Sequence, residues 1–89
     1  MKKVYIYTRG YYGRQIFRKI RNKYEILGFI DQKVHKKKLF DKKIYLPKDI
    51  KDHDFIFFSG FKKKEYLKLI KKNKFDLEKS IYLNTSEIK

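Results

Sequence analysis

The 89-residue chain contains no cysteine and no tryptophan, and it has only one proline and four glycines. Without cysteine, a disulfide framework, a cysteine-ligated zinc or iron–sulfur site and a thiol nucleophile are all excluded. Apolar runs are short, and none approaches the ~20 residues that cross a bilayer. Residues 1–7 are too short an apolar stretch for a secretory signal. We therefore expect a cytoplasmic chain that does not span a membrane.

Acidic residues are scarce as well, with 10 Asp and Glu against 25 Lys and Arg, so the formal net charge is +15. Such a charge favours nucleic acid or another polyanion as a partner, because neutralising phosphates releases counterions. However, the lysines are scattered, with short clusters at residues 36–38, 62–64 and 71–72, and only four residues are arginine. A solvated basic surface, encoded by A/T-rich codons, also accounts for the charge. The sequence leaves both interpretations open.

Apolar residues are abundant enough for a folded core. They make up 42% of the chain, and aromatic residues alone make up 18%, whereas disordered chains are poor in both. A chain this short can form one core but not two, so residues 1–89 are interpreted as a single domain. Short β-branched and aromatic runs predict five strands, at residues 4–7, 24–30, 43–46, 54–59 and 80–83.

Apolar residues three and four apart predict two amphipathic helices. The first follows a turn at residues 10–13 and ends near Asn22, and the second covers residues 62–73. Residues 32–43 are too polar for a well-packed helix and are expected to form an irregular connection, whereas Pro47 suits the first position of a helical turn. The residues expected on the buried side of the second helix are Tyr66, Leu67, Leu69 and Ile70.

Strands that alternate with helices are typical of α/β proteins with a parallel sheet and right-handed crossovers. We therefore predict a small Rossmann-like domain of three layers, with about five parallel strands in the order 3-2-1-4-5. In such sheets, ligands bind beyond the carboxyl ends of the strands, where the strand order reverses. The loops that contain Gly10 and Gly60 are expected to flank that crevice.

A glycine-containing loop follows the first predicted strand, at the position of the dinucleotide-binding fingerprint. In that motif, successive glycines allow a tight turn, the close approach of the backbone to a pyrophosphate, and helix–strand packing. Gly10 and Gly13 match the second and third glycines, whereas Thr8 replaces the first. N–H groups at the start of the helix, with Arg9 and Arg14 nearby, favour an anion.

Asp31 ends the second predicted strand, about 20 residues after Gly10, where the fingerprint places an acid that binds a ribose hydroxyl. The alternative is structural: the glycines serve only a turn and a packing contact, and the acid caps a loop. The residues expected to bind a nucleotide are Thr8, Arg9, Gly10, Tyr11, Tyr12, Gly13, Arg14, Asp31, Ser59 and Gly60.

No catalytic constellation stands out in the sequence. The two histidines, His35 and His53, lie in no metal-ligand spacing, and a histidine between two aspartates is typical of a solvated turn. Ser59 and Gly60 do not complete the pattern of a serine hydrolase. Neither a metal nor a definite cofactor is expected, and the ligand that the loop favours is a nucleotide.

Four segments of the chain together resemble a known family. Residues 4–14, 24–31, 46–50 and 54–60 are similar, in this order, to the PglD-like N-terminal domain. That Rossmann-like domain precedes the left-handed β-helix of bacterial sugar acetyltransferases of the sialic-acid and bacillosamine type. Similar modules accompany methyltransferases and glycosyltransferases of surface-polysaccharide loci. The resemblance implies a site for a sugar nucleotide, such as a UDP-sugar, with phosphate near the loop of Gly10, the nucleoside near Asp31, and a crevice lined by Ser59 and Gly60.

The acetyl-CoA site and catalytic histidine of that family belong largely to a β-helix of hexapeptide repeats, and these 89 residues contain no such repeat. If the chain ends at Lys89, the resemblance therefore implies a nucleotide-binding module of polysaccharide biosynthesis without its own catalytic chemistry, which is either a separated binding module or a partner for a transferase on another chain. Two other functions stay open. One is a basic protein that binds nucleic acid or another polyanion, and the other is a Rossmann-like interaction domain that has lost its ligand.

Overall fold

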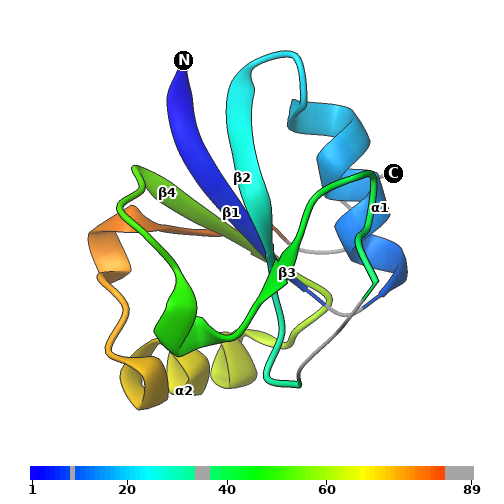
Figure 1. Cartoon of the computed structure of the whole chain (residues 1–89). Helices are drawn as coiled ribbons and strands as arrows, with labels where there is room; N and C mark the ends of the chain where they lie inside the picture. Colours follow the sequence, from blue (N-terminus) through cyan, green and yellow to red (C-terminus); the bar gives the residue numbers. More distant parts are fainter. Residues whose placement is uncertain (9, 34–36, 84–89) are drawn as a thin grey trace.

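The computed structural model describes residues 1–8, 10–33 and 37–83, in which strands and helices alternate (Figure 1). Arg9, His35 and the C-terminal tail, residues 84–89, lie outside the described residues. The strands are β1 (Lys2–Thr8), β2 (Tyr24–Ile30), β3 (Ile44–Tyr45), β4 (Phe55–Ser59) and β5 (Ser80–Tyr82). The helices are α1 (Tyr11–Ile20) and α2 (Lys63–Asn73), together with the short 3₁₀ helices η1 (Pro47–Asp49) and η2 (Leu77–Lys79).

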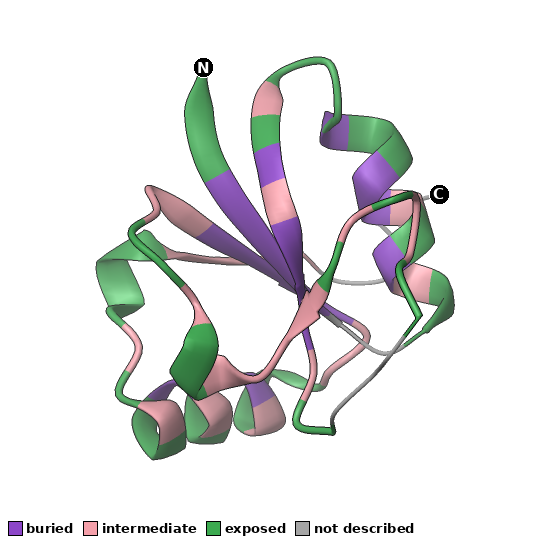
Figure 2. Ribbon diagram, in the orientation of Figure 1, coloured by how far each residue is buried: buried purple, intermediate pink, exposed green. Residues whose placement is uncertain are grey.

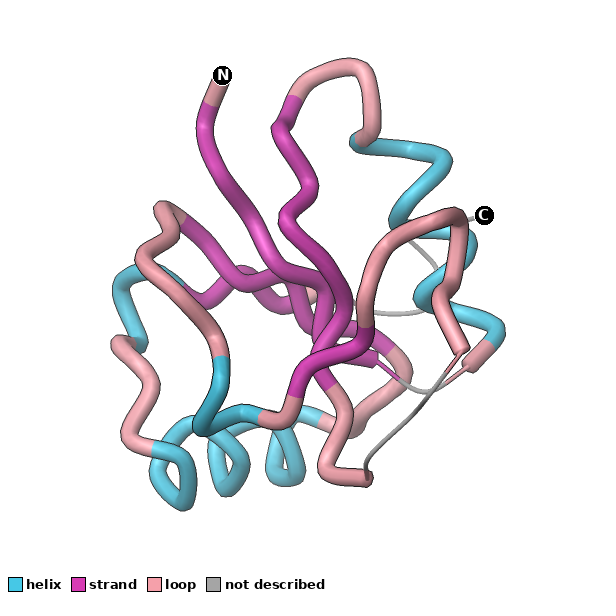
Figure 3. The backbone as a smooth tube through the Cα atoms, in the orientation of Figure 1, coloured by secondary structure: helices cyan, strands magenta, loops and turns pink. Residues whose placement is uncertain are grey.

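The strands of the sheet pair in parallel, in the order β3-β2-β1-β4-β5. The predicted α/β class and strand order are therefore confirmed. Helix α1 packs on one face of the sheet and α2 on the other, which makes three layers (Figure 3). The strand order reverses between β1 and β4, because the chain leaves β1 through α1 toward one edge and leaves β4 through α2 toward the other.

Strand β1 is buried on both faces, and its side chains divide the core into two clusters. Val4 and Ile6 pack in the cluster on the α1 side, whereas Tyr5 and Tyr7 pack in the cluster on the α2 side. None of these four residues is more than 3% exposed, and Figure 2 shows this part of β1 as a continuous buried band. The alternation follows from strand geometry, in which successive side chains point to opposite faces.

Strand β2 contains a bulge that distributes its apolar residues between the two faces. Its register against β1 passes from Ile26 to Gly28 while β1 advances by one residue, so Leu27 has no partner of its own. The extra residue resets the alternation, and Ile26 and Phe29 both join the cluster on the α1 side. In a regular strand, residues three apart would face opposite sides.

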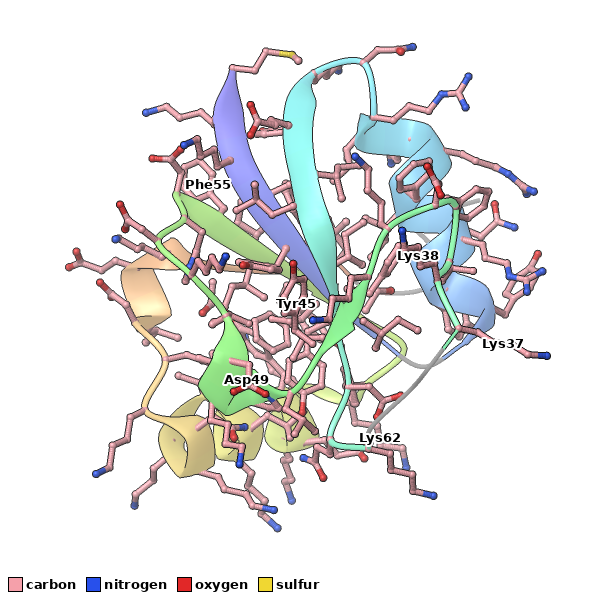
Figure 4. The ribbon with its side chains drawn as sticks, viewed as in Figure 1. Lys37, Lys38, Tyr45, Asp49, Phe55 and Lys62 are labelled. Carbon is pink, nitrogen blue, oxygen red and sulfur yellow. The ribbon has the colours of Figure 1, made fainter. Side chains whose placement is uncertain are left out.

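Gly28 allows β3 to approach β2 closely. A Cβ atom on this glycine would lie 2.6 Å from Cε2 of Tyr45 and 2.7 Å from the carbonyl oxygen of Lys43. The Tyr45 ring instead makes an edge-to-face contact with Tyr5, with the two ring centroids 5.6 Å apart. Figure 4 shows Tyr45 near the middle of the molecule, where β3 crosses in front of the sheet.

The connection from β2 to β3 is irregular in its described part, as predicted, and it contains a tight turn at residues 39–42. The ends of this turn exchange two backbone hydrogen bonds of 2.9 Å, and Phe40 and Asp41 have φ angles of 50° and 63°. Two positive φ angles are typical of a type I′ turn, which favours asparagine and glycine. The turn is held by Phe40, whose ring stacks on Phe17 at 4.4 Å between centroids and lies 5.6 Å from the guanidinium of Arg18.

Helix α1 begins earlier than the sequence predicts. The predicted turn at residues 10–13 is wrong in its extent, because the helix already starts at Tyr11. Gly10 makes the turn by itself, with a φ angle of 42°, and its carbonyl oxygen accepts a hydrogen bond from the N–H of Gly13 at 3.1 Å. The helix also ends before Asn22.

Helix α2 buries Tyr66 and Ile70 against the sheet. Leu67, predicted to be buried, is 45% exposed, because consecutive helical residues are turned by about 100° around the axis. Lys74, directly after the helix, has the left-handed φ angle of 56°. The N–H of Phe75 then donates to the carbonyl oxygen of Ile70 at 3.0 Å, which forms a Schellman motif, and Phe75 packs against the core on the α2 side.

Replacing Lys74 by glycine is expected to stabilise the protein. Glycine adopts the left-handed conformation without the steric cost of a Cβ atom, so Lys74→Gly should raise the free energy of unfolding by about 0.5–1 kcal/mol. Urea denaturation followed by circular dichroism measures the change. Lys71→Gly removes the same charge inside the helix, where glycine costs about 1 kcal/mol. Destabilisation by both variants would contradict the assigned end of α2.

Adding a methyl group at Gly28 is expected to destabilise the protein. Because main-chain atoms of the β3 segment must move, Gly28→Ala should lower the free energy of unfolding by about 2–3 kcal/mol. For comparison, a Cβ atom at Gly10 meets no atom within 4 Å, so Gly10→Ala should cost only the backbone strain of its φ angle of 42° and ψ angle of −105°, about 1–3 kcal/mol. Thermal unfolding of the two variants measures these costs. A loss below about 0.5 kcal/mol for Gly28→Ala would exclude the close approach of β3 to β2.

Candidate functional site

A cavity of about 690 Å³ lies beyond the carboxyl ends of β1 and β2, against α2. Its volume is within the ~300–1,000 Å³ that is usual for small-molecule sites. The cavity is formed by the end of β1, the segments that follow β1, β2 and β4, and one side of α2. Its lining residues are Tyr7, Gly10, Asp31, Gln32, Lys33, Phe61, Glu65, Lys68, Leu69 and Lys72. Parallel α/β proteins bind their ligands at this end of the sheet.

Gly10 and Asp31, the two residues that define the predicted fingerprint, both line this cavity. The open space around Gly10 means that its backbone conformation, rather than steric crowding, favours glycine here. Asp31 directly follows β2, and its N–H donates to the carbonyl oxygen of Tyr45 at 2.9 Å. The Asp31 carboxylate accepts a hydrogen bond from the N–H of Lys33 at 3.2 Å. The predicted glycine and acid are therefore brought together by the fold.

The inner wall of the cavity is aromatic. Tyr7 and Phe61 line it with their rings edge to face and the centroids 5.7 Å apart. Tyr7 is 3% exposed, and in the described part of the chain no group lies in hydrogen-bonding geometry with its hydroxyl.

The Tyr7 hydroxyl stays protonated at neutral pH. Burial raises its pKa above the ordinary value of 10.0, the side chain of Gln32 lowers the pKa, and the charge of Asp31 raises it. Gln32 therefore lies near the hydroxyl without completing a well-formed hydrogen bond. The protein thus holds a neutral hydroxyl, able to donate and to accept a hydrogen bond, in the wall of a cavity.

The predicted site residues at the end of β4 take different positions. Ser59 is fully buried, does not line the cavity, and its hydroxyl has no hydrogen-bond partner among the described residues. Its backbone pairs with that of Thr8 across β1 and β4. Gly60, with a φ angle of 81°, turns the chain toward the lining residue Phe61. Phe61, which follows the predicted pair, is therefore the residue after β4 that lines the cavity.

The predicted residues in the first turn of α1 do not line the cavity. Gly13 is buried, and Tyr12 packs against the core on the α1 side of the sheet. Tyr11 is 68% exposed, and Arg14 is also exposed. The fingerprint assigns phosphate to the start of this helix. Among the described residues of this region, only Gly10, which precedes α1, lines the cavity.

Helix α2 contributes four lining residues that the sequence analysis missed: Glu65, Lys68, Leu69 and Lys72. Their spacing of three and four residues places them on one side of the helix. The Glu65 carboxylate accepts a hydrogen bond from the N–H of Lys62 at 3.1 Å, at the start of the helix. The strand order could have predicted these lining residues, because the helix that follows β4 begins beside the point where the order reverses.

The positive charge is not gathered at the cavity. Lysine side chains are exposed on both helices and on the connections between strands, and Figure 4 shows nitrogen-tipped side chains around the whole outline of the molecule. In that view, Lys37 and Lys38 extend from the connection after β2, and Lys62 marks the start of α2. This distribution favours a solvated basic surface over one dedicated polyanion-binding face.

Metal and histidine chemistry have no support in the described ranges. No group of three or more histidine or acidic side chains there could hold a metal ion. Nδ1 of His53 lies 2.8 Å from the carbonyl oxygen of Lys51, and its ring packs edge to face with Tyr5, so His53 has a structural environment. Among the described helices, none is long and apolar enough to cross a membrane.

Comparisons with protein-family models, with curated proteins and with solved structures found no match. The resemblance to the PglD-like domain therefore stays a prediction. The arguments for a function are the position of the cavity, its lining side chains and the unpartnered Tyr7 hydroxyl.

Removing the Tyr7 hydroxyl is expected to stabilise the ligand-free protein. A buried polar group without a partner costs roughly 1–3 kcal/mol, and Tyr7→Phe keeps the ring that stacks on Phe58 at 5.2 Å. The free energy of unfolding should rise by about 1 kcal/mol. The matched control is Tyr5→Phe, because the Tyr5 hydroxyl accepts a hydrogen bond from the N–H of Lys51 at 2.8 Å and its loss should cost about 1 kcal/mol. Equal destabilisation by both would mean that Tyr7 has a partner.

Proposed function

We propose that this protein binds a nucleotide, with UDP-sugars as the favoured class, in the cavity between the strand ends and α2. One observation carries the proposal: Gly10, Asp31 and the buried Tyr7 line the same cavity at the reversal of strand order. The buried hydroxyls of Tyr7 and Ser59 both lack a partner in the described chain, which lowers stability, but only that of Tyr7 lies in the cavity wall, where a ligand can supply the partner. Buried groups that lower the stability of the folded protein in this way are typical of functional sites.

Each part of the cavity matches one part of such a ligand. The Asp31 carboxylate accepts hydrogen bonds from ribose hydroxyls, and the rings of Tyr7 and Phe61 pack against the base. Gln32 is exposed and lies beside the Tyr7 hydroxyl, so its side chain turns aside when a polar group of the ligand reaches that hydroxyl. The ligand thereby supplies the hydrogen-bond partner that the protein lacks.

The module binds its ligand without transforming it. The described lining residues include no histidine and no serine that could act as a base or a nucleophile. The sugar nucleotide is instead presented to a transferase on another chain, which is the arrangement expected from the resemblance to the PglD-like domain. Exposed apolar side chains give less support to a pure interaction domain. The large ones in the described residues are separated in the chain: Met1 precedes β1, and Tyr11, Leu67 and Leu77 lie on three different helices.

Calorimetric titration with UDP-N-acetylglucosamine, UDP and NAD tests the proposal. Saturable binding of at least one ligand is expected at about 150 mM salt, where interactions between distant exposed charges are screened. Asp31→Asn should weaken that binding about tenfold, because a hydrogen bond to a charged group contributes roughly 1.5–3 kcal/mol. Tyr7→Phe should also weaken it, although the same variant stabilises the ligand-free protein.

Asp52→Asn is the matched control for Asp31→Asn, since Asp52 is exposed and does not line the cavity. Its affinity for the ligand should stay within about twofold of the unaltered protein, a difference of less than 0.5 kcal/mol. Backbone amide shifts at Gly10 and Asp31 in NMR spectra should follow the same binding curve. Absence of binding at about millimolar ligand, with the fold intact, would refute the nucleotide-binding proposal.

A further inference from the structure

A second hollow, of about 360 Å³, lies next to the main cavity. This hollow lies between η1 and the C-terminal half of α2, and it shares Gln32 and Lys72 with the main cavity. Its lining residues are Gln32, Leu46, Pro47, Lys48, Lys72 and Asn73. A ligand made of two uncharged parts joined by an anionic linker would place the linker where the two hollows meet.

Lysines of α2 border this junction. Lys68 and Lys72 both line the main cavity, and Lys72 lines the second hollow as well. Because residues four apart lie on the same side of a helix, their ammonium groups can approach one ligand together. The lining carboxylate on the helix is that of Glu65, which accepts a hydrogen bond from the N–H of Lys62, the residue before α2. Asp31 lies on the opposite wall, next to Lys33.

The start of α1 is not placed to bind the same group. In parallel α/β proteins that bind dinucleotides, the pyrophosphate lies on the first turn of the helix after β1. Here Tyr12 and Gly13 in that turn do not line the cavity, and Tyr12 packs on the α1 side of the sheet. Among the described residues, the cations that line the cavity wall come from α2 and from Lys33.

We infer that the diphosphate of a nucleotide ligand is held by Lys68 and Lys72 of α2, at the junction of the two hollows, rather than by the first turn of α1. The inference rests on the proposed function and adds the position of the ligand: the nucleoside occupies the main cavity beside Asp31, and the sugar occupies the second hollow. The diphosphate joins the two parts across Lys72.

Paired substitutions on α2 test this assignment. Lys68→Gln combined with Lys72→Gln should weaken UDP binding by about tenfold or more, because two charge-assisted hydrogen bonds are lost. Lys63→Gln combined with Lys71→Gln removes the same charge from the same helix at exposed positions that do not line either hollow. The control pair should change the affinity by no more than about twofold. Uridine, which has no phosphate, should bind equally to both double variants.

The outcomes separate this inference from the proposed function. Equal UDP affinity in both double variants, with binding still lost in Asp31→Asn, would place the diphosphate elsewhere and overturn the inference alone. An equal loss in both double variants would show general charge attraction and would also overturn it. If UDP does not bind the unaltered protein, the proposed function fails together with the inference. A loss of UDP binding confined to Lys68→Gln/Lys72→Gln, with uridine binding unchanged, supports the assignment.

Discussion

The two-sided burial of β1 is the constraint on which the rest of the structure depends. The strand pairs with β2 on one side and β4 on the other, while its side chains enter both core clusters. A strand in this position cannot shift by one residue, because every buried side chain would move to the opposite face. Its carboxyl end is therefore fixed, and Tyr7 and Gly10 are fixed with it at the cavity.

The same burial lets a chain of charge +15 fold. Self-repulsion among the lysines opposes the compact state, and it is offset by aromatic packing on both faces of the sheet. Cations also contribute to this packing, since Arg18 lies over the ring of Phe40 and Lys43 over the ring of Tyr45. Most lysines can thus remain at the surface, whereas Lys68 and Lys72, which line the cavity, are positioned by α2.

Hydrogen bonding at the candidate site is less complete than at the neighbouring position of the same strand. Tyr5 and Tyr7 occupy equivalent places in the alternation of β1, yet the Tyr5 hydroxyl accepts a backbone hydrogen bond and the Tyr7 hydroxyl has no partner in the described chain. Buried polar groups are usually satisfied, and exceptions need an explanation. Of the two exceptions in the described chain, Tyr7 and Ser59, only Tyr7 lies in the cavity wall, where a ligand can supply the missing partner.

Local patterns in the sequence determined the strands, the helices, their order in the sheet and the placement of Gly10 and Asp31 at the same end of it, because each depends on neighbouring residues or on general rules of chain connection. The bulge that brings Ile26 and Phe29 to one face, the stacked turn at Phe40 and the contribution of Lys68 and Lys72 were decided only by tertiary structure. Each of these features depends on contact between segments far apart in the chain, and the spacing of residues along one segment contains no record of such contact.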